Sequence, residues 1–175
     1  MLLRLLPYIF TLVCASVPFY FSGEVVRVIE GDTIVIKHGD RMIPVRLYGI
    51  ETPESSQPFY KEARQFTEKL ALGQHVTVNV GMVNLPDGSI LNLELVRNGL
   101  AWWSRKYAPE DSTIADLELE AKTARMGLWS QRHPKPPWEM REKLTKELTP
   151  DEDELEKLEK EAQKAEKKKK KKTKK

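Results

Sequence analysis

The sequence predicts an α+β domain in which strands come first and helices follow. Apolar residues alternate with polar ones over residues 25–48, which is the period of half-buried strands. From residue 59 onward apolar residues recur at helical spacing in three segments, and each of these segments ends at a glycine. Strands followed by helices, without alternation of the two, are typical of the α+β class.

Composition divides the chain into an N-terminal segment at residues 1–23, a body at residues 24–140 and a tail at residues 141–175. The chain has 175 residues, of which 40% are hydrophobic, and this is enough for one ordinary core. The one cysteine, Cys14, lies in the N-terminal segment. The body therefore has neither a disulfide framework nor a cysteine-based metal site.

Residues 1–23 combine one early positive charge, an apolar run and small residues near Ala15-Ser16 or Ser22-Gly23. This pattern indicates a secretory signal peptide, and hence a secreted or extracytoplasmic protein. An uncleaved membrane anchor is the first alternative, because the apolar stretch is nearly long enough to span a bilayer. A buried N-terminal strand or helix is the second.

The first strands of the body are predicted to form a hairpin around the turn Glu30-Gly31-Asp32. Residues 42–48 follow as a third strand, with Val45 and Leu47 on one face and Arg46 on the other, near the end of the strand. Residues 50–58 contain two prolines and are expected to form a loop.

Helices are predicted at three later places. The first covers residues 59–72, the second begins at Leu91 or Asn92 with Asn92 as N-cap and runs to Asn98, and the third covers residues 112–125. The glycines that end these helices are Gly73, Gly99 and Gly127.

The tail contains 14 Lys+Arg and 10 Asp+Glu, and it ends in a run of lysines. Its leucines form a stripe too narrow for a core, which predicts a solvated helix that continues as a disordered basic tail. Such a tail could hold polyanions such as nucleic acid, or an anionic membrane surface, and the alternative is a solubilising tail without a specific partner.

The body is slightly acidic once both ends are set aside. It contains 14 Lys+Arg and 16 Asp+Glu, a net charge of −2, so it is not a broadly basic surface for nucleic acid. Binding of nucleic acid by the body would therefore need a local site with a metal ion.

Two short motifs, the turn Gly31-Asp32-Thr33 and residues 46–54 (RLYGIETPE), supply groups for such a site. Asp32 and Glu51 offer the charged oxygens that Ca²⁺ prefers, Arg46 offers a planar fork for phosphate oxygens, and Glu54 is left to act on a water molecule. Simpler roles are also open: a turn hydrogen bond for Asp32, an ion pair between Arg46 and Glu51, and a cap from Glu54.

These two motifs, the segment LNLELVRNGLAWW, the helix that ends in ARMGLW and the segment PPWE stand in an order that resembles the staphylococcal nuclease (thermonuclease) family over residues 24–139. The resemblance implies an OB-like five-stranded β-barrel packed with three helices. It also implies an enzyme that cleaves DNA and RNA with Ca²⁺ as cofactor. We expect the protein to be a monomer.

The same resemblance implies roles for individual residues. Asp32, Glu51 and the carbonyl of Thr52 would be Ca²⁺ ligands, Arg46 a phosphate clamp and Glu54 the general base. Glu51 stands where the best-known member of the family has aspartate, a change that a flexible Ca²⁺ shell tolerates.

One departure from the family pattern concerns the segment after the first helix. Relatives have a loop there, reading roughly Asp-Arg-Tyr-Gly-Arg, which carries a second catalytic arginine, whereas here residues 76–80 lead directly to Gly81. One glycine cannot reverse a chain between paired strands, so the barrel is expected to lack part of a strand or to pair in another way. An error in the gene model, or a skipped coding segment, is an equal explanation.

Loss of that arginine predicts slow hydrolysis, or a module that binds nucleic acid or protein without cleaving it. Arg105 is a candidate substitute, because it aligns without gaps with a site tyrosine of the best-known relative. Tyr107 aligns with a second such tyrosine and is a candidate substrate-binding residue.

Overall fold

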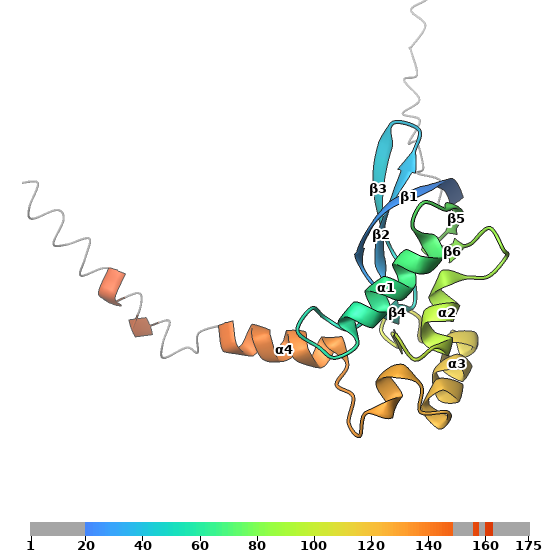
Figure 1. Ribbon diagram of the computed structural model, residues 1–175. Coiled ribbons are helices and arrows are strands. Elements are labelled where there is room, and N and C mark those ends of the chain that lie inside the picture. Colours follow the sequence, from blue (N-terminus) through green and yellow to red (C-terminus); the bar gives the residue numbers. More distant parts are fainter. Residues whose placement is uncertain (1–19, 149–155, 158–159, 163–175) are drawn as a thin grey trace, which may run out of the picture.

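The computed structural model describes residues 20–148, 156–157 and 160–162 (Figure 1). Five antiparallel strands form one sheet in the order β3-β2-β1-β5-β6, and β4 pairs with β7 in a second, two-stranded sheet. The elements are β1 (Tyr20–Glu30), β2 (Thr33–His38), β3 (Arg41–Arg46), β4 (Ile50–Glu51), α1 (Tyr60–Ala71), β5 (His75–Asn79), β6 (Met82–Asn84), α2 (Leu91–Arg97), β7 (Trp102–Trp103), α3 (Ser112–Thr123), the 3₁₀ helix η1 (Gly127–Ser130) and α4 (Pro137–Leu148).

The predicted α+β class is confirmed, and the sheet does not close into a barrel. The long strand β1 pairs with β5 through its first half and with β2 through its second half, so the sheet curves around one core. β3 and β6 are the two edges, and among the described strands they do not pair with each other. The arrangement is that of an incomplete OB-like barrel.

Helix α1 packs on β1, α2 packs on β6, and α3 packs on β7 of the two-stranded sheet, while α2 contacts both α1 and α3 (Figure 1). Their apolar faces meet the sheet residues in one core that includes Ile34, Ile36, Val76, Leu95 and Ile114. The predicted ranges of the three helices agree with the observed ones to within two residues at either end. This agreement arises because helical periodicity and the glycines that follow are local signals.

The hairpin between β5 and β6 explains how the chain reverses direction after β5. β5 ends at Asn79, which pairs with Met82, and Val80 and Gly81 form a two-residue turn with φ of 48° and 79°. Val80 therefore belongs to the turn rather than to the strand, and two residues are sufficient. Glycine is favoured at position 81, because its φ of 79° strains any L side chain and a Cβ atom there would lie 3.0 Å from the Cβ of Tyr48.

Asn92 is not the N-cap of α2, and that prediction was wrong. Ile90 holds the N-cap position without a side-chain cap, whereas Asn92 is the second residue of the helix and is fully buried. Its amide oxygen accepts from the backbone N–H of Val83, and its amide nitrogen donates to the carbonyls of Tyr48 and Gly81. Asn92 thus joins α2 to the β5–β6 hairpin and to the loop after β3.

The structure describes only part of the two segments that flank the predicted body. Residues 20–23, the last part of the segment predicted as a signal peptide or anchor, form the start of β1 and pair with β5. Residues 1–19 and most of the predicted tail, including the lysine run, lie outside the described residues. No helix in the described part of the chain is long and apolar enough to cross a membrane.

Candidate active site

The turn between β1 and β2 lies against the end of β3, and this contact brings Asp32 and Arg46 close together. The backbone N–H of Leu47 donates to the carbonyl of Asp32 at 2.8 Å, and Thr33 pairs with Arg46. The ladder between β1 and β2 has an irregularity between Val28 and Glu30, just before the turn. Such irregularities change the direction of side chains, and here they precede the predicted site residues.

Asp32 and Glu51 are almost closed to water, with 2% and 3% of each residue exposed. The carboxylate of Asp32 accepts from the Thr33 hydroxyl at 2.8 Å and from the backbone N–H of Thr52 at 3.0 Å. Glu51 accepts from the Ser104 hydroxyl at 3.1 Å, which the pairing of β4 with β7 makes possible. Buried carboxylates need such donors and also a nearby positive charge.

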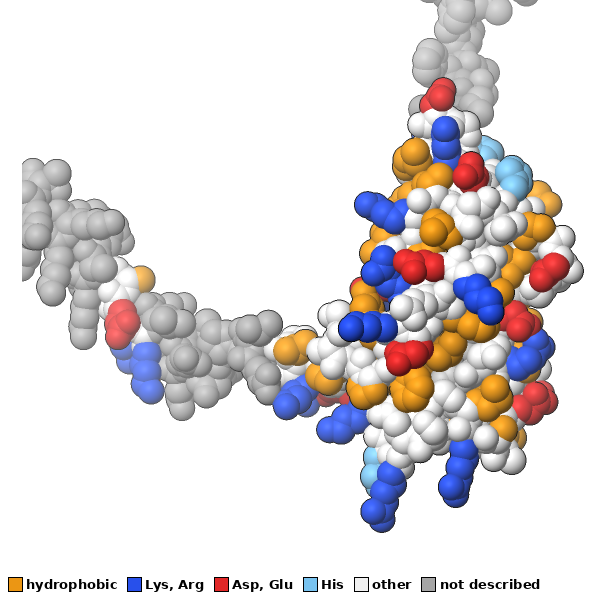
Figure 2. Space-filling model, in the orientation of Figure 1, with side chains coloured by type: hydrophobic (Ala, Val, Ile, Leu, Met, Phe, Trp, Pro, Cys, Tyr) orange, Lys and Arg blue, Asp and Glu red, His pale blue; other side chains and the backbone are white. Residues whose placement is uncertain are grey.

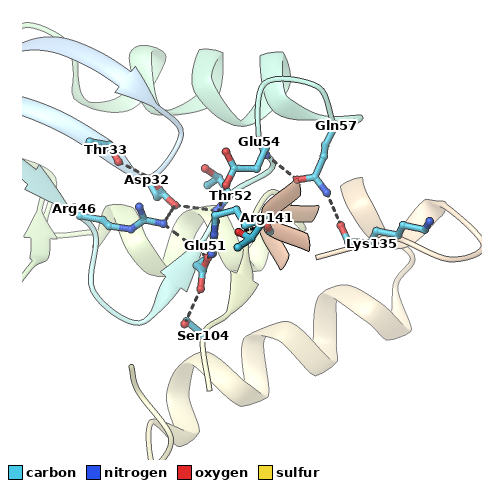
Figure 3. Close-up of polar contacts among 11 residues, drawn as sticks. Asp32, Thr33, Arg46, Glu51, Thr52, Glu54, Gln57, Ser104, Lys135 and Arg141 are labelled. Atoms are coloured by element: carbon cyan, nitrogen blue, oxygen red, sulfur yellow. Dashed lines mark hydrogen bonds and ion pairs between the residues drawn. The ribbon is translucent and has the colours of Figure 1, made fainter. Parts of the chain in front are cut away.

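Arg46 provides one of those charges. Its Nη2 atom lies 3.5 Å from Oδ2 of Asp32 and 3.8 Å from Oε2 of Glu51 (Figure 3). The two buried carboxylates therefore share one cationic nitrogen, and the side chain that carries it is 54% exposed. The ion pair between Arg46 and Glu51, one of the simpler roles considered from the sequence, is present.

Arg141 provides the second positive charge, and sequence reasoning missed it. It extends from α4, donates through Nη2 to Oε2 of Glu51, and donates through Nη1 to Oε1 of Glu54 at 2.6 Å (Figure 3). Burial lowers the pKa of the Arg141 guanidinium, but the hydrogen bonds and charges of Glu51 and Glu54 outweigh this and raise it. Its position at the first residue of the predicted tail concealed this role.

Glu54 lies in the loop after β4, and its side chain is 31% exposed. Its backbone N–H donates to Oε1 of Gln57 at 2.8 Å, and Nε2 of Gln57 donates to the carbonyl of Lys135 at 2.9 Å. Gln57 therefore connects the Glu54 loop to the segment that leads into α4. The Glu54 carboxylate itself is directed to Arg141 rather than to a backbone cap.

Glu30 is a further acidic residue of the site that was not predicted. Burial raises the pKa of its carboxyl group, and the charges of Asp32 and Glu54 raise it further, against the lowering effect of Arg46 and Arg141. The signal in the sequence was its place two residues before Asp32 in the same turn. It was read as part of the turn alone.

An open groove of about 910 Å³ gives access to these groups. Arg46, Glu54 and Arg141 line it together with Glu30 and Tyr107. A second hollow, of about 450 Å³, is lined by Glu51, Ser104, Arg105, Tyr107, Trp138 and Arg141. Arg141 and Tyr107 border both spaces, so the exposed ring of Tyr107 lies beside the site, as its predicted substrate-binding role requires.

The Arg105 guanidinium pairs with another acid. Its Nη2 atom lies 3.2 Å from Oε2 of Glu118 in α3, and its guanidinium lies 4.4 Å from the centre of the Trp103 ring. Glu118 is buried and also accepts from Lys122 and from the backbone N–H of Trp103. The role of Arg105 as a substitute catalytic residue stays a prediction.

Whether the residues suit a metal ion depends on the donors present. Within the described residues, no group of three or more His, Cys, Asp or Glu side chains is arranged to hold a metal ion. Two buried carboxylates, Asp32 and Glu51, nevertheless converge on one cationic nitrogen, and their oxygens are the ligands that Ca²⁺ prefers. The donor chemistry therefore fits a hard cation that completes its shell with water or substrate oxygens. The Thr52 carbonyl ligand stays a prediction.

The face of the molecule seen in Figure 2 carries both signs of charge. Figure 2 shows acidic and basic side chains interspersed over the face in view, in agreement with the small net charge of the body. A broad basic surface is not visible on that face.

Comparison with known proteins identifies the family of this chain. The sequence model of the family described as "Staphylococcal nuclease homologue" matches residues 44–131. The chain is 37% identical over 147 residues to a micrococcal nuclease of Shigella flexneri, covering 72% of this chain and 84% of that protein. It is also 34% identical over 135 residues to an uncharacterized endonuclease of Escherichia coli O157:H7, covering 71% and 85% of the two chains.

An uncharacterized endonuclease of Haemophilus influenzae is 29% identical over 156 residues, covering 82% of this chain and 86% of that protein. The predicted family is thus confirmed by relatives that share most of their length with this chain. The incomplete OB-like sheet and the buried acids beside two arginines agree with these likenesses. The chain belongs to the staphylococcal nuclease family and is a nuclease-type hydrolase.

Proposed function

We propose that this protein is a Ca²⁺-dependent phosphodiesterase that hydrolyses DNA and RNA. The observation that carries the proposal is the convergence of two buried carboxylates, from Asp32 and Glu51, on the guanidinium of Arg46, beside the half-buried carboxylate of Glu54. This set combines a place for a cation, donors for a phosphate group and a base within reach of water.

The charge balance supports a divalent cation. Asp32, Glu51 and Glu54 oppose Arg46 and Arg141, which leaves an excess of negative charge before Glu30 is considered. A phosphodiester would be repelled by such a site. Asp32 and Glu51 would hold Ca²⁺, and the bound ion would neutralise charge that builds up on the phosphate oxygens.

The other steps of the proposed reaction depend on side chains of the protein. Arg46 can exchange its contacts of 3.5 and 3.8 Å with the acids for shorter, charge-assisted hydrogen bonds to phosphate oxygens. Glu54 accepts a proton from the attacking water, and Gln57 keeps the Glu54 backbone in place. Ser104 holds the inner oxygen of Glu51.

The test is digestion of single-stranded DNA and RNA by the full chain, with Ca²⁺ and with a chelator. Glu54→Gln should lower kcat by roughly 100-fold or more, because a positioned general base contributes about that much. Glu62→Gln, which changes an exposed acid on α1, is the matched control and should leave the rate unchanged. Cleavage that continues in chelator and in Glu54→Gln would contradict the mechanism.

A second function is a module that binds nucleic acid or protein without cleaving it. The two-residue turn at Val80 and Gly81 favours it, because that turn leaves no loop from which a second arginine could extend. The same assay separates the two functions. Binding of single-stranded DNA by the wild-type chain, without cleavage at any Ca²⁺ concentration, would replace the nuclease proposal with this one.

A further inference from the structure

We infer that Arg141 is the second phosphate-binding guanidinium of this site, carried by α4 instead of by a loop of the sheet. The inference rests on the proposed function. It assigns a direct contact with the substrate to a residue that lies at the start of the charged C-terminal region.

The two arginines approach one carboxylate oxygen from different elements. Arg46 stands at the end of β3 with Nη2 3.8 Å from Oε2 of Glu51, and Arg141 donates from α4 to the same oxygen. Like charges are held this close only because the acids lie between them. A phosphate group in the groove would meet both guanidinium groups, each suited to its paired oxygens.

Arg141 remains accessible while it contacts the acids. Its side chain is 43% exposed and lines the groove that also contains Arg46. A guanidinium has five N–H donors, and the contacts with Glu51 and Glu54 need only two of them. The remaining donors are sufficient to bind a phosphate oxygen without releasing either acid.

The start of α4 is attached to the site by specific contacts. Pro137 is buried at the first position of the helix, and Trp138 lines the hollow that also contains Glu51 and Arg141. Gln57 connects the carbonyl of Lys135 to the backbone of Glu54, so the segment before α4 and the Glu54 loop are held together. Arg141 therefore reaches the acids from a fixed helix start.

A second guanidinium has a clear chemical purpose. Charge on the non-bridging oxygens increases in the transition state of phosphodiester hydrolysis, and positioned cationic donors stabilise it. The β5–β6 turn consists of Val80 and Gly81 and carries no arginine. Arg141 supplies the second guanidinium from α4, so a longer loop in the sheet is not needed for it.

The test compares three variants of the full chain: Arg141→Ala, Arg141→Lys and Lys146→Ala. Lys146 lies on the same helix, is exposed and pairs with Glu142, so Lys146→Ala removes one positive charge of α4 outside the groove. We expect Arg141→Ala to lower kcat/KM on single-stranded DNA by about 100-fold. Arg141→Lys should recover a minor part, because lysine keeps the charge and loses the fork. Lys146→Ala should match the wild type.

Binding is measured separately from cleavage. The probe is a phosphorothioate single-stranded oligodeoxynucleotide in Ca²⁺, and Arg141→Ala should weaken its affinity by about tenfold, the loss expected for one charge-assisted contact. Circular dichroism of each variant confirms that it is folded. Arg141→Lys retains the contact charge, so it remains informative if Arg141→Ala does not fold.

The outcomes distinguish this inference from the function on which it rests. If the wild type cleaves and Glu54→Gln does not, but Arg141→Ala equals the wild type in rate and affinity, the inference alone is overturned. Faster cleavage by Arg141→Ala overturns it too and indicates that Arg141 blocks the acids. A wild type that binds but never cleaves overturns the nuclease proposal, and the affinity of Arg141→Ala then still decides whether Arg141 binds phosphate. A wild type that neither binds nor cleaves overturns both.

Discussion

The pKa of the Glu30 carboxyl group is raised by burial and by the neighbouring negative charges of Asp32 and Glu54. The protonated form is therefore favoured more in the folded chain than in the unfolded chain, and the folded state holds more protons above the ordinary pKa of 4.5. Stability contributed by this group consequently falls as pH rises from about 4.5 through the raised pKa. At neutral pH the ionised Glu30 carboxylate therefore lowers the free energy of unfolding.

Replacing Glu30 with glutamine should remove that cost. We expect Glu30→Gln, measured without Ca²⁺ at low salt, to raise the thermal unfolding midpoint at pH 7 and to leave it nearly unchanged at pH 4. Glu24→Gln, an exposed acid on the same strand, is the control and should alter neither value. An equal gain at pH 4 and pH 7 would exclude a charge effect.

Individual residues also show the limit of reasoning from sequence at this scale. Asp32, Arg46, Glu51 and Glu54 were predicted as one site because the motifs that contain them lie close together in the chain, and the structure brings all four together. Arg141 was not predicted, because its partners Glu54 and Glu51 lie 87 and 90 residues away in the chain. The sequence next to Arg141 contains no motif that indicates these partners.

At the scale of single elements, the β5–β6 hairpin contains a strained turn. Val80 has φ of 48°, a left-handed conformation that costs a β-branched residue about 1–2 kcal/mol. Two-residue turns of this kind favour Asn-Gly, and the second residue is already Gly81. Val80 is 56% exposed, so its side chain contributes little to the core.

Val80→Asn should therefore stabilise the protein, by about 1 kcal/mol in chemical denaturation, because asparagine tolerates the left-handed conformation. Val26→Asn is the matched control. Val26 is 38% exposed and lies within β1, where asparagine is unfavourable, so the same substitution should be neutral or destabilising. Equal effects at the two positions would refute the explanation by turn strain.

The helices show which elements could be predicted. α1 and α3 carry clear apolar periodicity and end before Gly73 and Gly127, so both were expected nearly where they occur. α4 was expected to begin with the change in composition at residue 141, but it begins at Pro137. Its N-terminal turn belongs to the folded body, and composition cannot reveal such a contact.

At the scale of the whole molecule, binding of Ca²⁺ should appear as added stability. A ligand that binds only the folded chain contributes about 2.7 kcal/mol when its concentration is 100 times its Kd. We expect Ca²⁺ to raise the thermal unfolding midpoint of the wild type and to have no such effect on Asp32→Asn, which keeps the shape but loses one buried charge. Mg²⁺ at the same ionic strength is the control for general screening. An equal response of both proteins to Ca²⁺ would place the ion elsewhere.

By itself the sequence determined the α+β class, the family and the positions of three helices. It also predicted Asp32, Arg46, Glu51 and Glu54 as site residues, and the structure brings these four side chains together. Periodicity, turn glycines and closely spaced motifs are local properties, so a single chain contains them directly. Only the tertiary structure decided that the sheet stays open, that Val80 turns the chain and that Arg141 meets Glu51 and Glu54. These features depend on which distant surfaces pack together, because buried carboxylates take their compensating charge from whatever element folding places beside them.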